Sequence, residues 1–192
     1  MPRDIVQIRG TPGYGRYQAP KMRISRSQFN LDHEHKTTFD AGELIPYLLL
    51  EAVPGDTFTI KLNSFIRIFS PLDAPVMDNI RSDFDVYFVP WRLIWDNFTA
   101  MLGEHDGAGA QDQTFVMPRL ADGGTIAHSS CGHYFGLPVG LSTTAEYVNS
   151  GPFRAYRFIY SEFYRDQNLI AEPSNDRGNG PDPTFWAGTL GG

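Results

Sequence analysis

A long apolar run that ends in a turn restricts what this chain can fold into. Residues 44–53 are apolar except for Pro46 and Glu51. Such a run is typical of a strand buried on both faces or of a core helix, and Pro46 argues against a helix interior. The Pro-Gly-Asp sequence at 54–56 then predicts a tight turn, because proline presets one backbone angle and glycine tolerates the next. We therefore expect two strands joined at this point.

Two further segments, 57–69 and 83–89, alternate apolar and polar residues, as strands with one buried face do. Between them, residues 70–82 contain two prolines and are long for a hairpin loop, which favours a crossover between sheets. Together these strands predict an antiparallel sandwich or barrel. The side chains expected in its core are Phe58, Ile60, Leu62, Ile66, Phe84, Val86 and Phe88.

Two segments have helical periodicity. Residues 91–102 place aromatic and aliphatic side chains on one face, and Gly103 predicts the end of that helix. The second helix is expected to begin with Ser150 as N-cap and to run to about residue 165. Its other side carries arginines, which we expect to be solvated or paired with a neighbouring acidic subunit. These arginines are Arg154, Arg157 and Arg165.

Charge is distributed unevenly along the chain. Residues 1–27 carry a formal charge of +5, and because the whole chain carries −6, the remainder carries −11. The basic segment is rich in Gly and Pro and also contains Tyr14 and Tyr17, so we expect an extended arm. Such an arm can lie on an acidic neighbouring subunit or follow a nucleic-acid backbone, and both interpretations stay open. The candidate nucleic-acid-binding residues are Arg3, Arg9, Arg16, Lys21, Arg23 and Arg26.

The irregular segment 104–149 is expected at the surface. It contains three residues with metal-ligand chemistry, His128, Cys131 and His133, but no second ligand pair follows them. His33 and His35 resemble the start of a cupin metal motif, yet the glycine and glutamate spacings of that motif are absent. Nucleophile–base and phosphate-cradle motifs are also missing. We therefore expect no enzymatic activity, no cofactor and no metal.

Cys131 is the one cysteine of the chain, so an internal disulfide is excluded and a reducing compartment such as a bacterial cytoplasm is compatible with the sequence. The N-terminal residues lack the apolar core of a signal peptide, and no apolar run approaches about 18 residues. The default expectation is a protein that does not insert into a membrane.

Five motifs occur in an order that resembles the major capsid protein of gokushovirus-type microviruses, which are small icosahedral single-stranded DNA phages. They are HKTTFDAGELIP, PGDTF, APVMDN, DFDVYFVPWRLIWDNF and PFRAYRFIYSEFYRDQNL. None has a fixed chemical role, so the signal lies in their shared order and spacing. The resemblance spans roughly residues 25–170 and implies a viral jelly-roll β-sandwich, mainly β with two or more helices, and a structural role in a shell of many copies.

The resemblance also implies partners and a location. The partners are other copies of the chain, packaged single-stranded DNA, a small internal DNA-binding protein, a pilot or spike protein, and a host receptor. The expected location is the virion, after assembly in the host bacterial cytoplasm. The alternative function is a lectin-like or cupin-like β-sandwich binding module with its ligand in the loops of 104–149.

The expected layout is an extended arm at 1–27, a jelly-roll body at 28–170 with the loop insertion 104–149, and a loop or tail at 171–192. All five motifs belong to the early region of the family's sequence, and the Pro- and Gly-rich tail shows no strand pattern. We therefore expect an incomplete jelly roll, corresponding to the N-terminal portion of a longer protein, with apolar faces that lack part of their cover.

Overall fold

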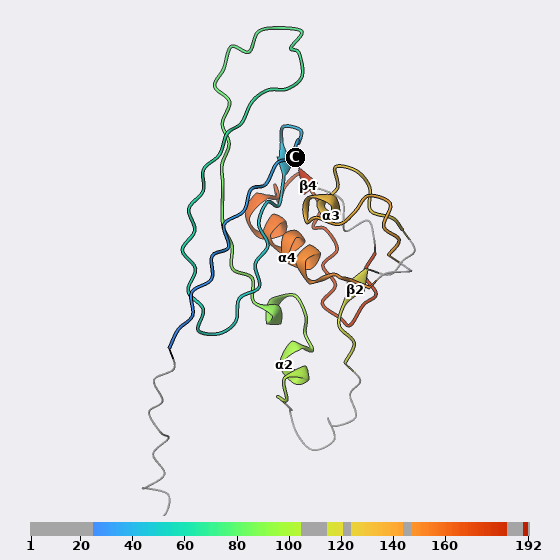
Figure 1. The fold of residues 1–192 in the computed structure, drawn as a ribbon. Coiled ribbons are helices and arrows are strands. Elements are labelled where there is room, and N and C mark those ends of the chain that lie inside the picture. The colour runs from blue at the N-terminus through green and yellow to red at the C-terminus, as the bar shows by residue number, and fades with distance from the viewer. Residues whose placement is uncertain (1–24, 105–114, 121–123, 144–146, 184–189, 192) are drawn as a thin grey trace, which may run out of the picture. The chain divides into compact units, whose positions relative to one another are not determined.

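The structure, a computed structural model, describes residues 25–104, 115–120, 124–143, 147–183 and 190–191. It divides into two units, residues 1–35 and 36–192. The described part of the first unit has no regular element; within it, the Asp32 N–H donates to Asn30 Oδ1 at 3.0 Å. All helices and strands that the structure describes lie in the second unit (Figure 1).

Helix α4 (Gly151–Ile159) confirms the second predicted helix. Ser150 occupies the N-cap position, but its hydroxyl makes no capping bond; instead Asn149 Oδ1 accepts the Gly151 N–H at 2.8 Å. Asparagine is as good an acceptor for these unpaired N–H groups as serine. The helix continues into a π-helical turn, η4 (Tyr160–Tyr164), and ends where Arg165 becomes extended.

The first predicted helix is interrupted, so the prediction of one continuous helix over 91–102 is wrong. A 3-10 helix, η2 (Trp91–Leu93), is followed by a turn and then by α2 (Phe98–Met101). The cause is a competing bond: the Asp96 N–H donates to the Arg177 carbonyl at 3.0 Å instead of to a carbonyl one turn earlier. Gly103, with φ of +99°, ends this region as expected.

The core is built around α4 by segments that were expected at the surface. Strand β2 (Arg119–Leu120) pairs antiparallel with β3 (Val148–Asn149), which sets Leu120 opposite Val148. Short helix α3 (Cys131–Tyr134) packs nearby. The expectation that segment 104–149 lies at the surface is therefore wrong for Leu120, Ile126 and Val148, which are buried in the core with residues of α4, although Val116, Val139 and Tyr147 are exposed. The buried cluster consists of Leu120, Ile126, Cys131, Val148, Phe153 and Tyr156.

The predicted strands do not form ladders in the described part of the chain. Within residues 43–89 the one strand is β1 (Glu43–Leu44), and it pairs antiparallel with β4 (Leu190–Gly191). Residues 45–89 run as a long trace without arrows in Figure 1. The turn between the predicted strands is confirmed, since Asp56 N–H donates to the Val53 carbonyl at 3.0 Å and Gly55 has φ of +97°. The observed β structure is thus two small antiparallel sheets.

The α4–η4 region holds both ends of this long extended segment. Tyr156 donates its hydroxyl to the Leu44 carbonyl at 2.8 Å, and Tyr164 donates to Asp85 Oδ2 at 2.7 Å. Between the two ends, the rings of Tyr47 and Phe84 meet edge to face at 5.7 Å. The segment therefore leaves and re-enters the folded body at fixed points.

Among the described residues, no helix has the length and apolar character needed to cross a membrane.

Candidate functional site

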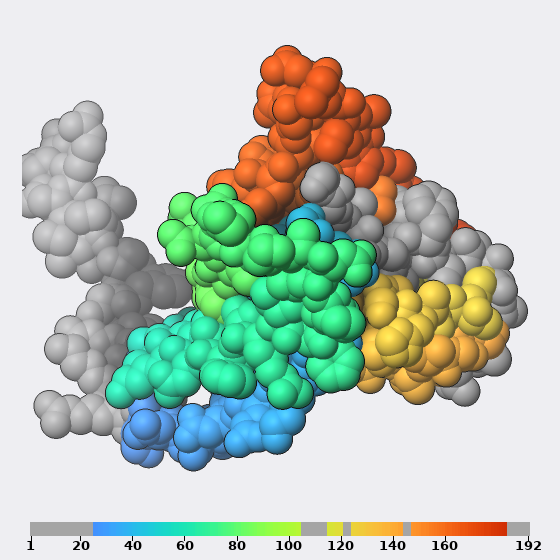
Figure 2. All heavy atoms as spheres, turned by 90° about the horizontal axis from the view of Figure 1, so that it is seen from above, coloured from blue at the N-terminus to red at the C-terminus, as the bar shows by residue number. Residues whose placement is uncertain are grey.

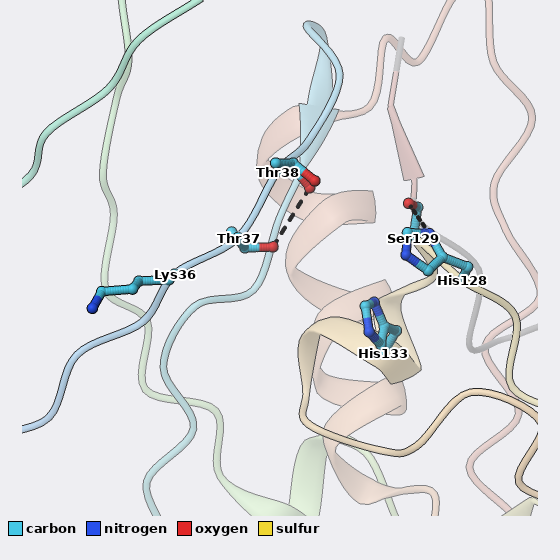
Figure 3. A pocket seen from close by; sticks show the side chains of 6 residues that line it. All are labelled: Lys36, Thr37, Thr38, His128, Ser129 and His133. Atoms are coloured by element: carbon cyan, nitrogen blue, oxygen red, sulfur yellow. Dashed lines mark hydrogen bonds between the residues drawn. The ribbon is translucent and has the colours of Figure 1, made fainter. Parts of the chain in front are cut away.

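A pocket of about 390 Å³ lies between residues 36–38 and the segment that leads into α3 (Figure 3). Its side chains bear hydroxyl, imidazole and ammonium groups, and no carboxylate lines it. In Figure 3 the Lys36 amine points away from the imidazoles, so this lysine contributes its stem at the rim. The lining residues are Lys36, Thr37, Thr38, His128, Ser129 and His133.

The pocket wall is shaped by the N-terminus of α3. Ser130 is the N-cap: its hydroxyl accepts the His133 N–H at 3.3 Å and donates to the Ala127 carbonyl at 2.7 Å. The preceding residue, Ser129, has φ of +54°, which makes it the only non-glycine residue with positive φ in the described chain. A serine held there costs on the order of 1 kcal/mol, and such positions cluster at functional sites.

The two histidines of the pocket lie against each other. Their ring centroids are 4.9 Å apart and their planes are inclined by 33°. His128 Nδ1 is hydrogen-bonded to Ser129 Oγ at 2.8 Å. His133 Nδ1 is buried and has no hydrogen-bond partner among the described residues. A buried polar atom without a partner is costly, and because this nitrogen has almost no accessible surface, a ligand atom in the pocket cannot reach it.

Tyr134 attaches the threonine segment to α3, because its hydroxyl donates to the Thr38 carbonyl at 3.1 Å. Desolvation by burial raises the pKa of this phenol, a hydrogen bond with Ser129 lowers it, and the charges of Asp40 and Glu43 raise it. Two carboxylates therefore lie close to the pocket without lining it.

The structure does not assemble the zinc-ligand set that the sequence suggested. Cys131 is fully buried in the core, and desolvation strongly raises the pKa of its thiol, whereas a zinc ligand must be a thiolate. The rings of His128 and His133 are tilted by 33° with their centroids 4.9 Å apart, and His128 Nδ1 is already hydrogen-bonded to Ser129 Oγ. Among the described residues, no group of three or more His, Cys, Asp or Glu side chains fits a metal ion.

The other histidine pair lies in the first unit. His33 and His35 are both exposed, and His33 Nδ1 lies 2.9 Å from the Leu31 carbonyl oxygen. A bond to a carbonyl oxygen requires this nitrogen to carry the hydrogen.

A buried ion pair joins α4 to the C-terminal segment. Arg154 is fully buried and grips Asp182 with two hydrogen bonds of 2.7 Å, from Nε to Oδ2 and from Nη2 to Oδ1. Its Nη1 donates to the carbonyls of Ile94 and Gly178. The expectation that this arginine is solvated or pairs with a neighbouring subunit is therefore wrong. A planar guanidinium can donate to all these acceptors at once, and these hydrogen bonds offset the free-energy cost of burying its charge.

Arg157 and Arg165 are also engaged within the chain. Arg157 is buried, desolvation lowers its pKa, and its Nε donates to the Ser174 carbonyl at 3.1 Å. Arg165 donates to the Ile170 carbonyl at 2.9 Å. Arg157 of α4 and Arg165, which follows η4, thus hold residues 170–174 near the helix.

The apolar faces of residues 57–69 and 83–89 are uncovered, so the prediction that they form the core is wrong for this structure. Exposure ranges from 40% at Phe84 to 78% at Phe88. The alternation itself is present in extended backbone, but no second layer of described residues packs on it. In Figure 2 the teal and green atoms of this region are open to view. The exposed set is Phe58, Ile60, Leu62, Ile66, Phe84, Val86 and Phe88.

Most of the basic arm lies outside the described residues, so its role stays a prediction. The residues concerned are Arg3, Arg9, Arg16, Lys21 and Arg23. Arg26, the remaining member, is described and exposed.

Comparison with known proteins identifies the family. A family model described as "Capsid protein (F protein)" matches residues 18–184, which is most of the chain. This chain belongs to that capsid protein family. The capsid chain is 36% identical over 165 residues to capsid protein VP1 of Bdellovibrio phage phiMH2K, where 86% of it aligns with 30% of the relative. It is 38% identical over 159 residues to capsid protein VP1 of Chlamydia phage 1, where 79% of it aligns with 26% of the relative.

A third relative, capsid protein VP1 of Spiroplasma virus 4, is 30% identical over 150 residues. These relatives confirm the resemblance to gokushovirus-type microviruses. The capsid chain spans less than a third of the length of each of them.

Sequence reasoning missed two features of the site. The Arg154–Asp182 pair joins residues 28 positions apart, and nothing in the local pattern around either residue signals it. The pocket joins residues 36–38 with residues near 130, and only the clustering of His128 and His133 pointed toward it.

Proposed function

We propose that this chain is a structural part of the major capsid subunit of a small icosahedral shell that encloses single-stranded DNA. The family match over residues 18–184 carries the proposal, together with relatives that are all named capsid protein VP1. The alternative of a lectin-like or cupin-like binding module is not favoured by these relatives. The proposed location is the virion, after assembly in the host bacterial cytoplasm.

A jelly roll is the proposed architecture of the complete subunit. Residues 57–69 and 83–89 have the alternation and extended backbone of jelly-roll strands, but their apolar faces are uncovered. Exposed apolar faces and unpaired backbone groups favour pairing with further strands. In this proposal, strands from outside the described residues complete both sheets.

The exposed apolar side chains of residues 57–69 and 83–89 are proposed to mediate self-association, and no enzymatic activity is proposed. Aromatic side chains such as Phe88, with 78% of its surface exposed, are the residue types that dominate protein interfaces. The arm is proposed to lie against a neighbouring acidic subunit or the packaged DNA. An internal DNA-binding protein, a pilot or spike protein and a host receptor are proposed as further partners.

Analytical ultracentrifugation over a hundredfold concentration range, with negative-stain electron microscopy, tests the proposal. We expect oligomers or shell-like particles that grow with concentration, and a shift toward monomer in a Val86→Lys, Phe88→Lys double variant. Lys61→Ala, on the same extended segment, serves as the matched control. A chain that stays monomeric at every concentration, with the double variant indistinguishable from it, would contradict the proposal.

A further inference from the structure

We propose that the junction of Asn179 and Gly180 is a self-modifying site, at which the backbone nitrogen of Gly180 attacks the side-chain amide of Asn179. The attack forms a C–N bond and closes a succinimide ring. The amide nitrogen of Asn179 leaves as ammonia and takes the proton that the Gly180 nitrogen loses. Water then opens the ring at either carbonyl, which leaves aspartate or isoaspartate at position 179. The reaction consumes water, releases ammonia and needs no oxidant, metal or partner protein.

Glycine follows Asn179 because the fold leaves little room for a side chain there. Gly180 has φ of +59°, in the left-handed region that favours glycine. A Cβ atom on it would lie 3.2 Å from Asp182 Oδ1 and 3.3 Å from Arg154 Nη2, which belong to the two partners of the buried ion pair. The same lack of a side chain leaves the nitrogen of Gly180 unshielded as a nucleophile.

The nitrogen of Gly180 is also available for the attack. Asn179 and Gly180 are both half-buried, so the junction is partly accessible to water. In the part of the chain that the structure describes, no group accepts a hydrogen bond from the Gly180 N–H. The attack therefore requires no backbone hydrogen bond to be broken first.

The side-chain carbonyl of Asn179 is held by two donors. Its Oδ1 accepts from the Trp95 Nε1–H at 3.0 Å and from the Asn97 Nδ2–H at 2.9 Å. An indole N–H can only donate, so the atom that faces it is the oxygen, and the amide nitrogen is left as the leaving group. Negative charge develops on this oxygen during the attack, and two fixed donors stabilise that charge, as in an oxyanion hole. Trp95 is fully buried, so its donor is already in position.

The modification acts on the buried ion pair. Arg154 donates to the Gly178 carbonyl on one side of the junction and to the Asp182 carboxylate on the other. Isoaspartate continues the chain through its side-chain carbonyl, which adds a backbone atom between these two contacts. We therefore expect the isoaspartate form to unfold at a lower urea concentration than an Asn179→Asp variant, which has the same charge and a normal backbone.

Incubation of the full 192-residue chain at pH 8 over several days, followed by tryptic peptide mapping with mass spectrometry, tests the proposal. Trypsin cleaves after Arg177, so the junction lies in the peptide 178–192. We expect this peptide to lose ammonia and then to gain the acid, several times faster than the peptide that contains the exposed junction of Asn63 and Ser64. Electron-transfer fragmentation separates isoaspartate from aspartate.

A donor variant separates the contribution of the fold from that of the sequence motif. Asn97 occupies the N-cap position of α2, but its side chain makes no capping bond, so Asn97→Ala removes the donor to Oδ1 without removing a cap. We expect the reaction of the folded chain to slow about tenfold, since a hydrogen bond to developing charge is lost, and to be unchanged in urea. Asn168→Ala, which removes an exposed amide elsewhere, is the matched control and should leave the rate unchanged.

An unmodified peptide 178–192 after the incubation overturns the proposal. An equal or higher rate in Asn97→Ala also overturns it, because the bonds to Oδ1 would then only restrain the side chain. If circular dichroism shows that Asn97→Ala is unfolded, the wild-type chain decides the case. Faster reaction in the folded chain than in urea supports the site, and equal or slower reaction in the folded chain overturns it, whatever the self-association experiment shows.

Discussion

The side chain of Arg154 links the C-terminal segment to the rest of the fold through its guanidinium group. It is fully buried and connects Asp182 with the carbonyls of Ile94 and Gly178, so it joins three segments of the chain. An isolated buried charge is far more costly than a buried pair. Removing either partner should therefore be much worse than removing an exposed pair.

We expect Arg154→Met to lower the free energy of unfolding by about 3–5 kcal/mol, because the Asp182 carboxylate remains buried without its partner. Urea denaturation followed by tryptophan fluorescence measures this change. Arg81→Met is the matched control, since the side chains of the Arg81–Asp83 pair are 83% and 62% exposed, and it should cost less than about 1 kcal/mol. An equal loss of unfolding free energy in both variants would show that the buried pair contributes no more to stability than the exposed pair.

Burial also determines the chemistry of Cys131. Desolvation raises the pKa of its thiol, and the nearby charge of Arg157 only partly offsets this effect. Because the thiolate is the reactive form, we expect negligible labelling by iodoacetamide in the folded chain at pH 7 to 9 and full labelling in urea. Rapid labelling of the folded chain at pH 8 would contradict the burial of this side chain.

At the scale of elements, the start of α4 is constrained by an aromatic cluster. A Cβ atom on Gly151 would overlap the ring of Trp91, coming within 2.9 Å of Cζ3 and closer still to Cη2. The ring cannot easily move, because it stacks on Phe98 at 5.9 Å and meets Trp95 edge to face. Glycine at this position is therefore explained by the close approach of a neighbouring ring.

We expect Gly151→Ala to destabilise the chain by about 1–3 kcal/mol, although alanine is the better helix former by about 1 kcal/mol. Thermal denaturation of the single variant and of a Gly151→Ala, Trp91→Leu double variant measures the coupling. The alanine should cost less when the large ring is absent. An equal cost in both backgrounds would mean that the ring is not the obstacle.

Sequence periodicity predicted elements well where their partners are close in the chain. Helix α4 and the turn at 54–56 depend on local signals, namely a helical stripe with a cap and a glycine at positive φ, and both are confirmed. The continuous helix at 91–102 is absent because Arg177, far away in sequence, accepts the Asp96 N–H. No local pattern contains that information.

The same reasoning applies to the predicted core and to the pocket. Alternation at 57–69 correctly indicates which side chains share a face, but burial also requires a second layer, which periodicity cannot supply. The actual core uses Leu120, Ile126 and Val148, which lie in segments without periodicity. The pocket residues were visible in the sequence only as His128 and His133, because their neighbours at 36–38 are distant in the chain.

At the scale of the whole molecule, the separation of charge is the property with the clearest functional test. The first 27 residues carry +5 and the remainder −11, and we propose that the arm contacts DNA or an acidic neighbour. The two roles differ in how they respond to salt, because phosphate contacts release bound counterions.

We expect the affinity for single-stranded DNA to fall with salt, with a log–log slope of about −0.7 for each phosphate contact. Deleting residues 1–27 should make this slope less negative, because several phosphate contacts are lost. Fluorescence anisotropy between low and physiological salt measures the slope. A slope that does not change on deletion would leave only the contact with a neighbouring subunit.

The attachment of the long extended segment at both ends has a consequence for assembly. Leu44 is held by Tyr156, and Asp85 is held by Tyr164, so a single helical body fixes where the segment departs and where it returns. Closing a loop of this length costs conformational entropy, and here the chain loses that entropy when it folds, before any partner binds. An incoming strand thus encounters two ends that are already held in place, and more of its contact energy remains available as binding affinity.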